Sequence, residues 1–198
     1  VYDNFIERIT ARAEALRLGD GSDAQIDVGP LVDGNAFKSV LRYMDSGRED
    51  GASLVCGGAI AEGPGLRKGY FVKPTVFVGV TSDMRIAREE IFGPVLSVMR
   101  AKDLDEALMI ANDSEYGLSS SIFTNDAARI FRFIDEIETG KTHINSPTTG
   151  GEAHIPFGGI KSTGVGEREQ GSTALDFYTE LKVVYVDYTG RKREGNLY

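Results

Sequence analysis

The spacing of apolar residues predicts two amphipathic helices near the start of the chain. In the first, apolar side chains recur at spacings of four, four and three residues, which places them on one face. They are Phe5, Ile9, Ala13 and Leu16. Gly19 is expected to end this helix, because glycine readily adopts a positive φ. The second helix is predicted at residues 34–44, and its core positions are Phe37, Val40, Leu41 and Met44.

Short apolar runs alternate with helical patterns through the middle of the chain. Strands are predicted at residues 53–56, 71–80, 95–99, 118–124 and 143–145, and a helix at residues 104–111. Pro74 is expected to place its strand near a sheet edge or a bulge. The alternation favours an α/β fold with a largely parallel sheet flanked by helices. Ligands gather beyond the carboxyl ends of such strands, so the loops of interest are residues 89–94, 116–119 and 145–164.

A further helix is expected after Asn125, which is a favourable N-cap residue, and before Gly140. Its predicted core stripe is Ile130, Phe131, Ile134 and Ile137.

The end of the chain has a different pattern. Residues 181–188 predict a long strand with no helix after it, and an unpaired strand edge needs a partner. Another part of the protein or a second subunit is expected to pair with it. The chain is therefore divided into residues 1–178 and a tail of residues 179–198, of which residues 191 onward are expected to be solvated.

Composition narrows the possible functions. The net charge of −8 disfavours nucleic acid and anionic membrane as partners, and no apolar run approaches the length of a membrane helix. One cysteine excludes an intrachain disulfide and fits a cytoplasmic location. That residue, Cys56, lies in a buried-strand context and is expected to be an ordinary core thiol. One cysteine and two histidines make no plausible zinc or iron site.

Two segments carry candidate chemistry. In the first, Glu89 to Val95, a carboxylate pair precedes an aromatic residue and a Gly-Pro turn. The carboxylate of Glu90 can accept two hydrogen bonds from a vicinal diol such as a ribose, and Phe92 can pack against the same ring. A surface turn with a buried phenylalanine is the alternative. The second segment is the glycine-rich loop of residues 145–164, and a loop this long is usually functional. It matches neither a Walker loop nor the G-x-G-x-x-G fingerprint.

Five segments, in order, resemble the aldehyde dehydrogenase superfamily over almost the whole chain. They are residues 69–76, 89–95, 111–119, 156–161 and 177–182. The resemblance implies that Glu90 holds the nicotinamide ribose, that Phe92 packs beside it, and that Leu118 lines the nicotinamide side of the catalytic tunnel. It implies a cofactor, NAD or NADP, in the full-length protein and a small-molecule aldehyde as substrate.

The same resemblance assigns the remaining site residues. Phe157 is part of the aldehyde-binding wall, and residues 145–155, including Asn145, shape the substrate mouth. Arg168 and Glu180 resemble a pair that braces this loop at the subunit interface, although the match at residues 164–169 needs one extra residue. The strand at residues 181–188 resembles the family's oligomerisation strand, which implies a homo-oligomer, either a dimer or a tetramer.

No catalytic residue is expected in this chain. By resemblance, the cysteine nucleophile, the general base and the dinucleotide-binding domain lie upstream of Val1, so the chain is interpreted as an excised piece, inactive alone, of an enzyme that forms a cysteine thioester. The segment at residues 147–151 resembles semialdehyde dehydrogenases, where Thr148 or Thr149 would bind a substrate carboxylate. No arginine lies between Asn145 and Phe157, so a strong carboxylate anchor is expected in the part of the enzyme upstream of Val1. The alternatives are a non-catalytic oligomerisation or interaction protein and a small nucleotide-binding domain.

Overall fold

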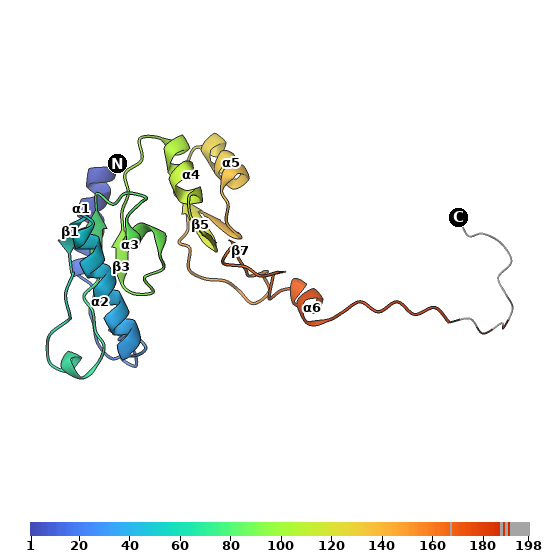
Figure 1. Cartoon of the computed structure of the whole chain (residues 1–198), viewed down its shortest axis with the longest axis horizontal. Coiled ribbons are helices and arrows are strands. Elements are labelled where there is room, and N and C mark those ends of the chain that lie inside the picture. Colours follow the sequence, from blue (N-terminus) through green and yellow to red (C-terminus); the bar gives the residue numbers. More distant parts are fainter. Residues whose placement is uncertain (167, 187, 189, 191–198) are drawn as a thin grey trace. The chain divides into compact units, whose positions relative to one another are not determined.

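The computed structural model describes residues 1–166, 168–186, 188 and 190, which fold into two compact units. The first unit comprises residues 1–115 and 125–137, and the second comprises residues 116–124 and the described residues from 138 onward (Figure 1). The helices of the first unit are α1 (Tyr2–Glu14), α2 (Gly34–Glu49), the 3-10 helix η1 (Leu66–Lys68), α3 (Arg85–Arg88), α4 (Leu104–Asn112) and α5 (Ala127–Glu136).

The first unit is built around a three-stranded sheet with the order β1-β2-β3. Strand β1 (Ser53–Cys56) pairs antiparallel with β2 (Thr75–Val78), and β2 pairs parallel with β3 (Val95–Ser97). Successive side chains of a strand point to opposite faces. Val76 accordingly packs in a cluster with Ala13 of α1, whereas Phe77 packs in a cluster with α2. The two helices therefore contribute to different cores on the two faces of the sheet.

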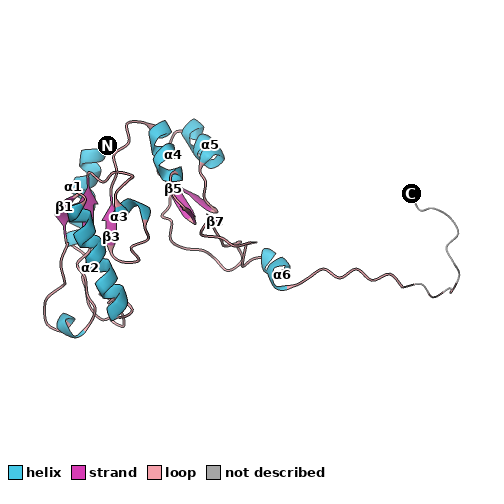
Figure 2. Ribbon diagram, viewed as in Figure 1, coloured by secondary structure: helices cyan, strands magenta, loops and turns pink. Residues whose placement is uncertain are grey.

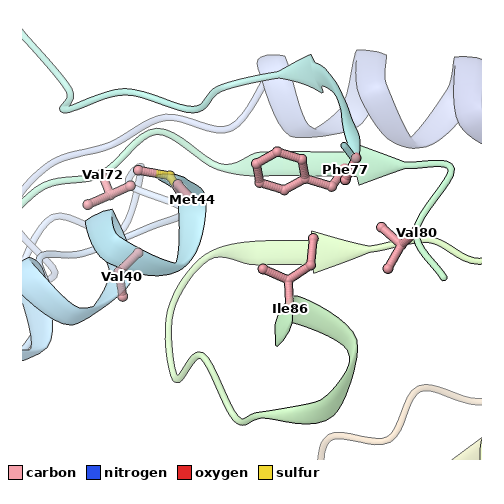
Figure 3. Close-up of a cluster of buried hydrophobic side chains, with 7 residues drawn as sticks. Val40, Met44, Val72, Phe77, Val80 and Ile86 are labelled. Carbon is pink, nitrogen blue, oxygen red and sulfur yellow. The ribbon is translucent and has the colours of Figure 1, made fainter. Parts of the chain in front are cut away.

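The larger cluster of buried side chains lies between α2 and the sheet. Val40 and Met44 of α2 meet Phe77 of the central strand, together with Val80 and Ile86 (Figure 3). Val40 and Phe77 have no exposed surface. Burial of such side chains is the main force that stabilises a fold, so this cluster is a main source of stability for the first unit.

Three expected boundaries in this unit are corrected. α1 ends at Glu14, not near Gly19, because the Arg17 backbone N–H donates to the Asp27 carboxylate (2.9 Å) and turns the chain into a bridge between Leu18 and Val28. α2 continues five residues beyond the predicted end, to Glu49. The strand predicted at residues 71–80 is confirmed only at Thr75–Val78, which is a central strand, so Pro74 marks the start of the strand and not an edge. A bulge does interrupt its pairing with β1.

Helix α5 also differs from its prediction. Asp126, not Asn125, caps it by accepting hydrogen bonds from the backbone of Ala128 (2.9 Å) and Arg129 (3.3 Å). It ends at Glu136, four residues before Gly140. Its buried side chain is Phe133, with Ile137 on the same face four residues later, whereas the predicted core residues Phe131 and Ile134 are exposed.

Gly140 has another function. A Cβ at this position would overlap the carbonyl oxygen of Gly158, while its backbone N–H donates to the Gly117 carbonyl (2.9 Å). It is therefore a point of close backbone approach, which only glycine permits.

The second unit has two small sheets. Strand β4 (Tyr116–Gly117) pairs antiparallel with β7 (Ile160–Lys161), and β5 (Ser119–Ile122) pairs parallel with β6 (Lys141–Ile144). Helix α6 (Thr173–Tyr178) follows. The α/β class is confirmed, and its strands are distributed over three sheets that mix parallel and antiparallel pairs.

Beyond α6, the described residues 179–186, 188 and 190 are exposed and are assigned to no strand of this chain (Figure 2). Part of the predicted strand at residues 181–188, namely residue 187, and the predicted solvated end at residues 191–198 lie outside the described residues. The predicted division after residue 178 stays a prediction. In the described part of the chain, no helix combines the length and the apolar character needed to cross a membrane.

Candidate functional site

The carboxylates of Glu89 and Glu90 have different surroundings. Glu89 is held by Arg85 through two hydrogen bonds (2.8 and 2.9 Å) and accepts another from the Tyr43 hydroxyl (2.8 Å). These contacts, with Arg85 first and Tyr43 second, lower the pKa of Glu89. Among the described residues, Glu90 is exposed and has no hydrogen-bond or ion-pair partner. Only Glu90 is therefore available for a ligand.

Phe92 projects into solvent from a backbone held in an unfavourable conformation. Its φ is 52°, in the left-handed region that phenylalanine rarely adopts, and 80% of its surface is exposed. Such a residue costs about 1–3 kcal/mol and persists only where its surroundings fix it. The alternative of a buried phenylalanine in a surface turn is therefore wrong.

The neighbours of Phe92 fix the turn. Ile91 packs on the larger core cluster, and a Cβ on Gly93 would lie 2.5 Å from a methyl group of Val40. The Pro94 carbonyl then accepts the Thr75 backbone N–H (2.8 Å). The sequence predicts that the turn follows a strand. It instead follows α3 and leads into β3. Its position is set by close packing against α2.

In the second unit, two of the sequence motifs lie against each other. Residues 116–117 pair with residues 160–161, and the Gly117 backbone N–H also donates to the Thr163 hydroxyl (2.9 Å). This pairing brings Leu118, which follows β4, into the same unit as Phe157, which precedes β7. Leu118 is 37% exposed, and its carbonyl accepts the backbone N–H of Lys141 (2.9 Å).

Asn145 fixes the start of the glycine-rich loop, which follows β6 as predicted. Its amide oxygen accepts the Thr124 backbone N–H (2.8 Å), and its amide nitrogen donates to the Thr124 carbonyl (3.0 Å). Its φ is 53°, a conformation that asparagine tolerates better than most residues. The next residue is held as well, because the Ser121 hydroxyl donates to the Ser146 carbonyl (2.6 Å).

Farther along the loop, the predicted substrate-binding residues differ in their surroundings. Thr148 and Thr149 are exposed, whereas Phe157 is half-buried. The backbone of Phe157 pairs with that of Glu169, and its ring lies below the ammonium group of Lys141, 4.6 Å from the ring centre. Lys141 also donates to the Gly150 carbonyl (3.1 Å). Lys141, the first residue of β6, therefore contacts the loop at two points, Gly150 and Phe157.

The predicted bracing pair is not joined in this chain. Arg168 donates to the Gly159 carbonyl (2.6 Å) and packs on Gly158, whereas Glu180 is exposed. Within the described part of the chain, no ion pair links Arg168 to Glu180. Arg168 thus braces the backbone just before β7.

Cys56 is the core thiol that its sequence context predicts. It is the last residue of β1 and is buried in the cluster that contains Ala13 of α1, and this burial raises the pKa of its thiol. A neutral, buried thiol is a poor nucleophile. Among the residues that the structure describes, no group of three or more histidine, cysteine and acidic side chains is arranged to hold a metal ion.

Sequence reasoning missed Lys141. The strand predicted at residues 143–145 does not include Lys141, whereas β6 begins at that residue. Alternation along β6 places Lys141 on the same face as His143. It did not reveal the contact with Phe157, since these residues are far apart in sequence.

Comparison with known proteins places the chain in a family. The family model described as "Aldehyde dehydrogenase family" matches residues 1–184. An alpha-ketoglutarate semialdehyde dehydrogenase of Haloferax volcanii is 49% identical over 95% of this chain and 39% of its own length. A betaine aldehyde dehydrogenase of Brucella anthropi is 45% identical over 93% of this chain and 38% of its own length.

A solved structure agrees with these matches. The crystal structure of a Mycobacterium tuberculosis aldehyde dehydrogenase complexed with NAD+ matches with a TM-score of 0.83 and 38% identity, over 94% of this chain and 38% of that one. The chain thus spans about two fifths of the length of the curated relatives. On its sequence and its fold, the chain belongs to the aldehyde dehydrogenase family.

Proposed function

We propose that this chain is the carboxy-terminal part of an NAD(P)-dependent aldehyde dehydrogenase that oxidises an aldehyde to a carboxylic acid through a cysteine thioester. The observation that supports this most directly is the turn at residues 89–94. It presents one carboxylate without a partner among the described residues and one exposed aromatic ring, and it fixes both on a packed core.

The turn fits a nicotinamide cofactor. A carboxylate that accepts two hydrogen bonds suits a ribose diol, and the face of Phe92 suits the sugar or the ring beside it. In the proposed enzyme Glu90 and Phe92 hold the nicotinamide ribose, and Leu118 lines the nicotinamide side of the tunnel. When bound, the nicotinamide accepts the hydride that leaves the aldehyde carbon. The contribution of this chain is positioning, which fixes the cofactor before the reaction begins.

Phe157 and the loop of residues 145–157 form the proposed aldehyde-binding wall. The anchors at Asn145 and Lys141 hold this loop at its start and at its middle. Thr148 and Thr149 are exposed and offer hydroxyl groups to a substrate carboxylate. We propose a semialdehyde as the substrate class, in line with the resemblance at residues 147–151. The nucleophile and the general base belong to the remainder of the enzyme, so the 198-residue chain alone should be inactive.

Residues 181–186 support the proposed homo-oligomer. This segment exposes an apolar series, Leu181, Val183, Val184, Tyr185 and Val186, and is assigned to no strand of its own chain. Pairing with a second subunit would cover these side chains and satisfy the backbone groups of an added strand. The alternative of a non-catalytic interaction protein is not favoured by the comparisons.

The test compares the whole gene product with the 198-residue chain. Purified whole protein should produce NADH or NADPH in the presence of an aldehyde, and the chain alone should produce none. Glu90→Gln in the whole protein should raise the KM for the cofactor roughly tenfold, which corresponds to about 1.4 kcal/mol. The matched control is Glu89→Gln, which removes a carboxylate already held by Arg85 and should leave that KM unchanged. Turnover by the chain alone, or equal cofactor KM changes in both variants, would contradict the proposal.

A further inference from the structure

Lys141 contacts three parts of the proposed substrate region, one through its backbone and two through its ammonium group. The backbone N–H of Lys141 donates to the Leu118 carbonyl, and its side chain reaches the Gly150 carbonyl of the loop and the face of Phe157. The residue is half-buried. Its ammonium group is therefore next to the proposed aldehyde-binding wall.

The bonding of this ammonium group is incomplete. An ammonium group has three N–H donors and no acceptor. The Gly150 carbonyl takes one donor, and the Phe157 ring interacts with the charge without taking a strong hydrogen bond. Among the described residues, no carboxylate lies within ion-pair distance of Lys141. Two donors and a full positive charge are left for a ligand.

Other charged groups of the same unit already have partners. Lys161 forms an ion pair with Glu138 (2.6 Å), and Arg168 donates to the Gly159 carbonyl. Glu152 lies beside His154 (3.4 Å). Neither Glu138 nor Glu152 neutralises Lys141. The positive charge at the wall is therefore not balanced from within this part of the chain.

We propose that Lys141 is a specificity-determining residue that binds the carboxylate at the far end of a semialdehyde substrate. The inference rests on the proposed function and extends it, because it names the residue that reads the charge of the substrate. It differs from the expectation that a strong carboxylate anchor must lie outside this chain. An ammonium group at the wall attracts an anionic aldehyde and repels a cationic one.

The experiment uses the whole protein and three aldehydes that differ in charge: 5-oxopentanoate (anionic), pentanal (neutral, with the same chain length) and betaine aldehyde (cationic). Lys141→Met removes the charge and keeps the length of the side chain. We expect it to raise the KM for 5-oxopentanoate about tenfold, as the loss of one charge-assisted contact would. The KM for pentanal should rise much less, because pentanal has no carboxylate, and any rise that it shows measures the loss of the contacts with Gly150 and Phe157. Lys141→Arg, which keeps the charge, should restore most of the lost affinity for 5-oxopentanoate.

A purely structural function of Lys141 gives a different result. If the residue only fastens the loop through Gly150 and Phe157, Lys141→Met will change the kinetics of 5-oxopentanoate and pentanal equally. That outcome overturns the proposal, as does a protein that prefers betaine aldehyde to 5-oxopentanoate before any substitution.

Binding of glutarate, measured by calorimetry, separates this inference from the proposed function because it needs no turnover. A tenfold weaker affinity for glutarate in Lys141→Met supports the assignment even if the protein oxidises no aldehyde, which would overturn the proposed function alone. Unchanged glutarate affinity overturns the assignment of Lys141 alone.

Discussion

The turn at residues 89–94 and the loop at residues 145–157 each present proposed ligand-binding residues, but different forces hold them. In the turn, Ile91 packs on the buried cluster and Gly93 lies against Val40. In the loop, most side chains from 147 to 156 are exposed, and the backbone is held by polar contacts of Asn145 and Lys141. One segment is fixed by close packing and the other by a few hydrogen bonds.

This difference has consequences for rigidity. Apolar packing is lost only when the core opens, so the turn should keep its shape for as long as the first unit is folded. A segment held by few exposed hydrogen bonds opens locally at a lower free energy. We infer that close packing keeps the strained Phe92 in place, whereas the loop can adjust to substrates of different shape.

The strongest challenge to the packed turn is Gly93→Ala. The added Cβ would lie 2.5 Å from a methyl group of the fully buried Val40, so the turn or α2 must move. Overpacking of this kind costs about 1–3 kcal/mol. Urea denaturation of the purified chain measures the loss. The control is Gly21→Ala, where a Cβ would meet no atom within 4 Å. Equal stability of the two variants would show that the turn is not held by this contact.

Asn145→Ala removes the polar anchor of the loop. It deletes both hydrogen bonds to Thr124 and places alanine, which tolerates a positive φ less well than asparagine, at this position. We expect the free energy of unfolding to fall by about 1–2 kcal/mol. Hydrogen exchange of the Thr124 amide, which donates to the Asn145 side chain, should become faster. Amides of the β2 strand in the first unit should exchange as before.

Asn145→Gly sharpens the same test, because glycine accepts the backbone conformation but lacks the amide. If Asn145→Gly and Asn145→Ala accelerate exchange at Thr124 equally, the hydrogen bonds matter and the conformation does not. Unchanged exchange in both variants would contradict the anchoring function of Asn145.

The smallest expected effect is a pH dependence at the base of the turn. Arg85 first, and Tyr43 second, hold the pKa of Glu89 below its ordinary value of 4.5. An acid with a lowered folded-state pKa stabilises the fold above its unfolded-state pKa, and the contribution is lost as the pH falls through the folded-state value. Stability should therefore decline below about pH 4.5 more steeply in the original chain than in Glu89→Gln.

Tyr43→Phe completes this test. It removes the hydrogen bond from the Tyr43 hydroxyl to Glu89, which is the second cause of the lowered pKa of Glu89, and it leaves the ion pair between Glu89 and Arg85 in place. It should keep part of the pH dependence, which denaturation at a series of pH values will measure. Identical profiles of stability against pH for the original chain and Glu89→Gln would show that the contacts of Glu89 with Arg85 and Tyr43 contribute nothing to the pH dependence of stability. Both side chains of the ion pair are partly exposed, so a modest effect is expected.

The sequence by itself determined the α/β class, the family and most of the secondary structure. Periodicity of apolar residues identified α2, α4 and the short strands, because those elements bury one face or both, and burial selects the residue type. The ordered motifs led to Glu90, Phe92 and Phe157. Helix ends were less predictable, because neither Gly19 nor Gly140 ends a helix. A side chain at Gly19 would collide with Ile26, and one at Gly140 would collide with the backbone of Gly158.

Only the tertiary structure decided how the two carboxylates divide their functions, and which cation reaches the proposed substrate wall. Glu89 and Glu90 are adjacent and chemically alike, and only the position of Tyr43 and Arg85 distinguishes them. Lys141 meets Phe157 across fifteen intervening positions of the sequence, and those positions carry no sign of the contact. Distances between residues far apart in sequence depend on how the whole chain packs, and for that reason no local pattern specifies them.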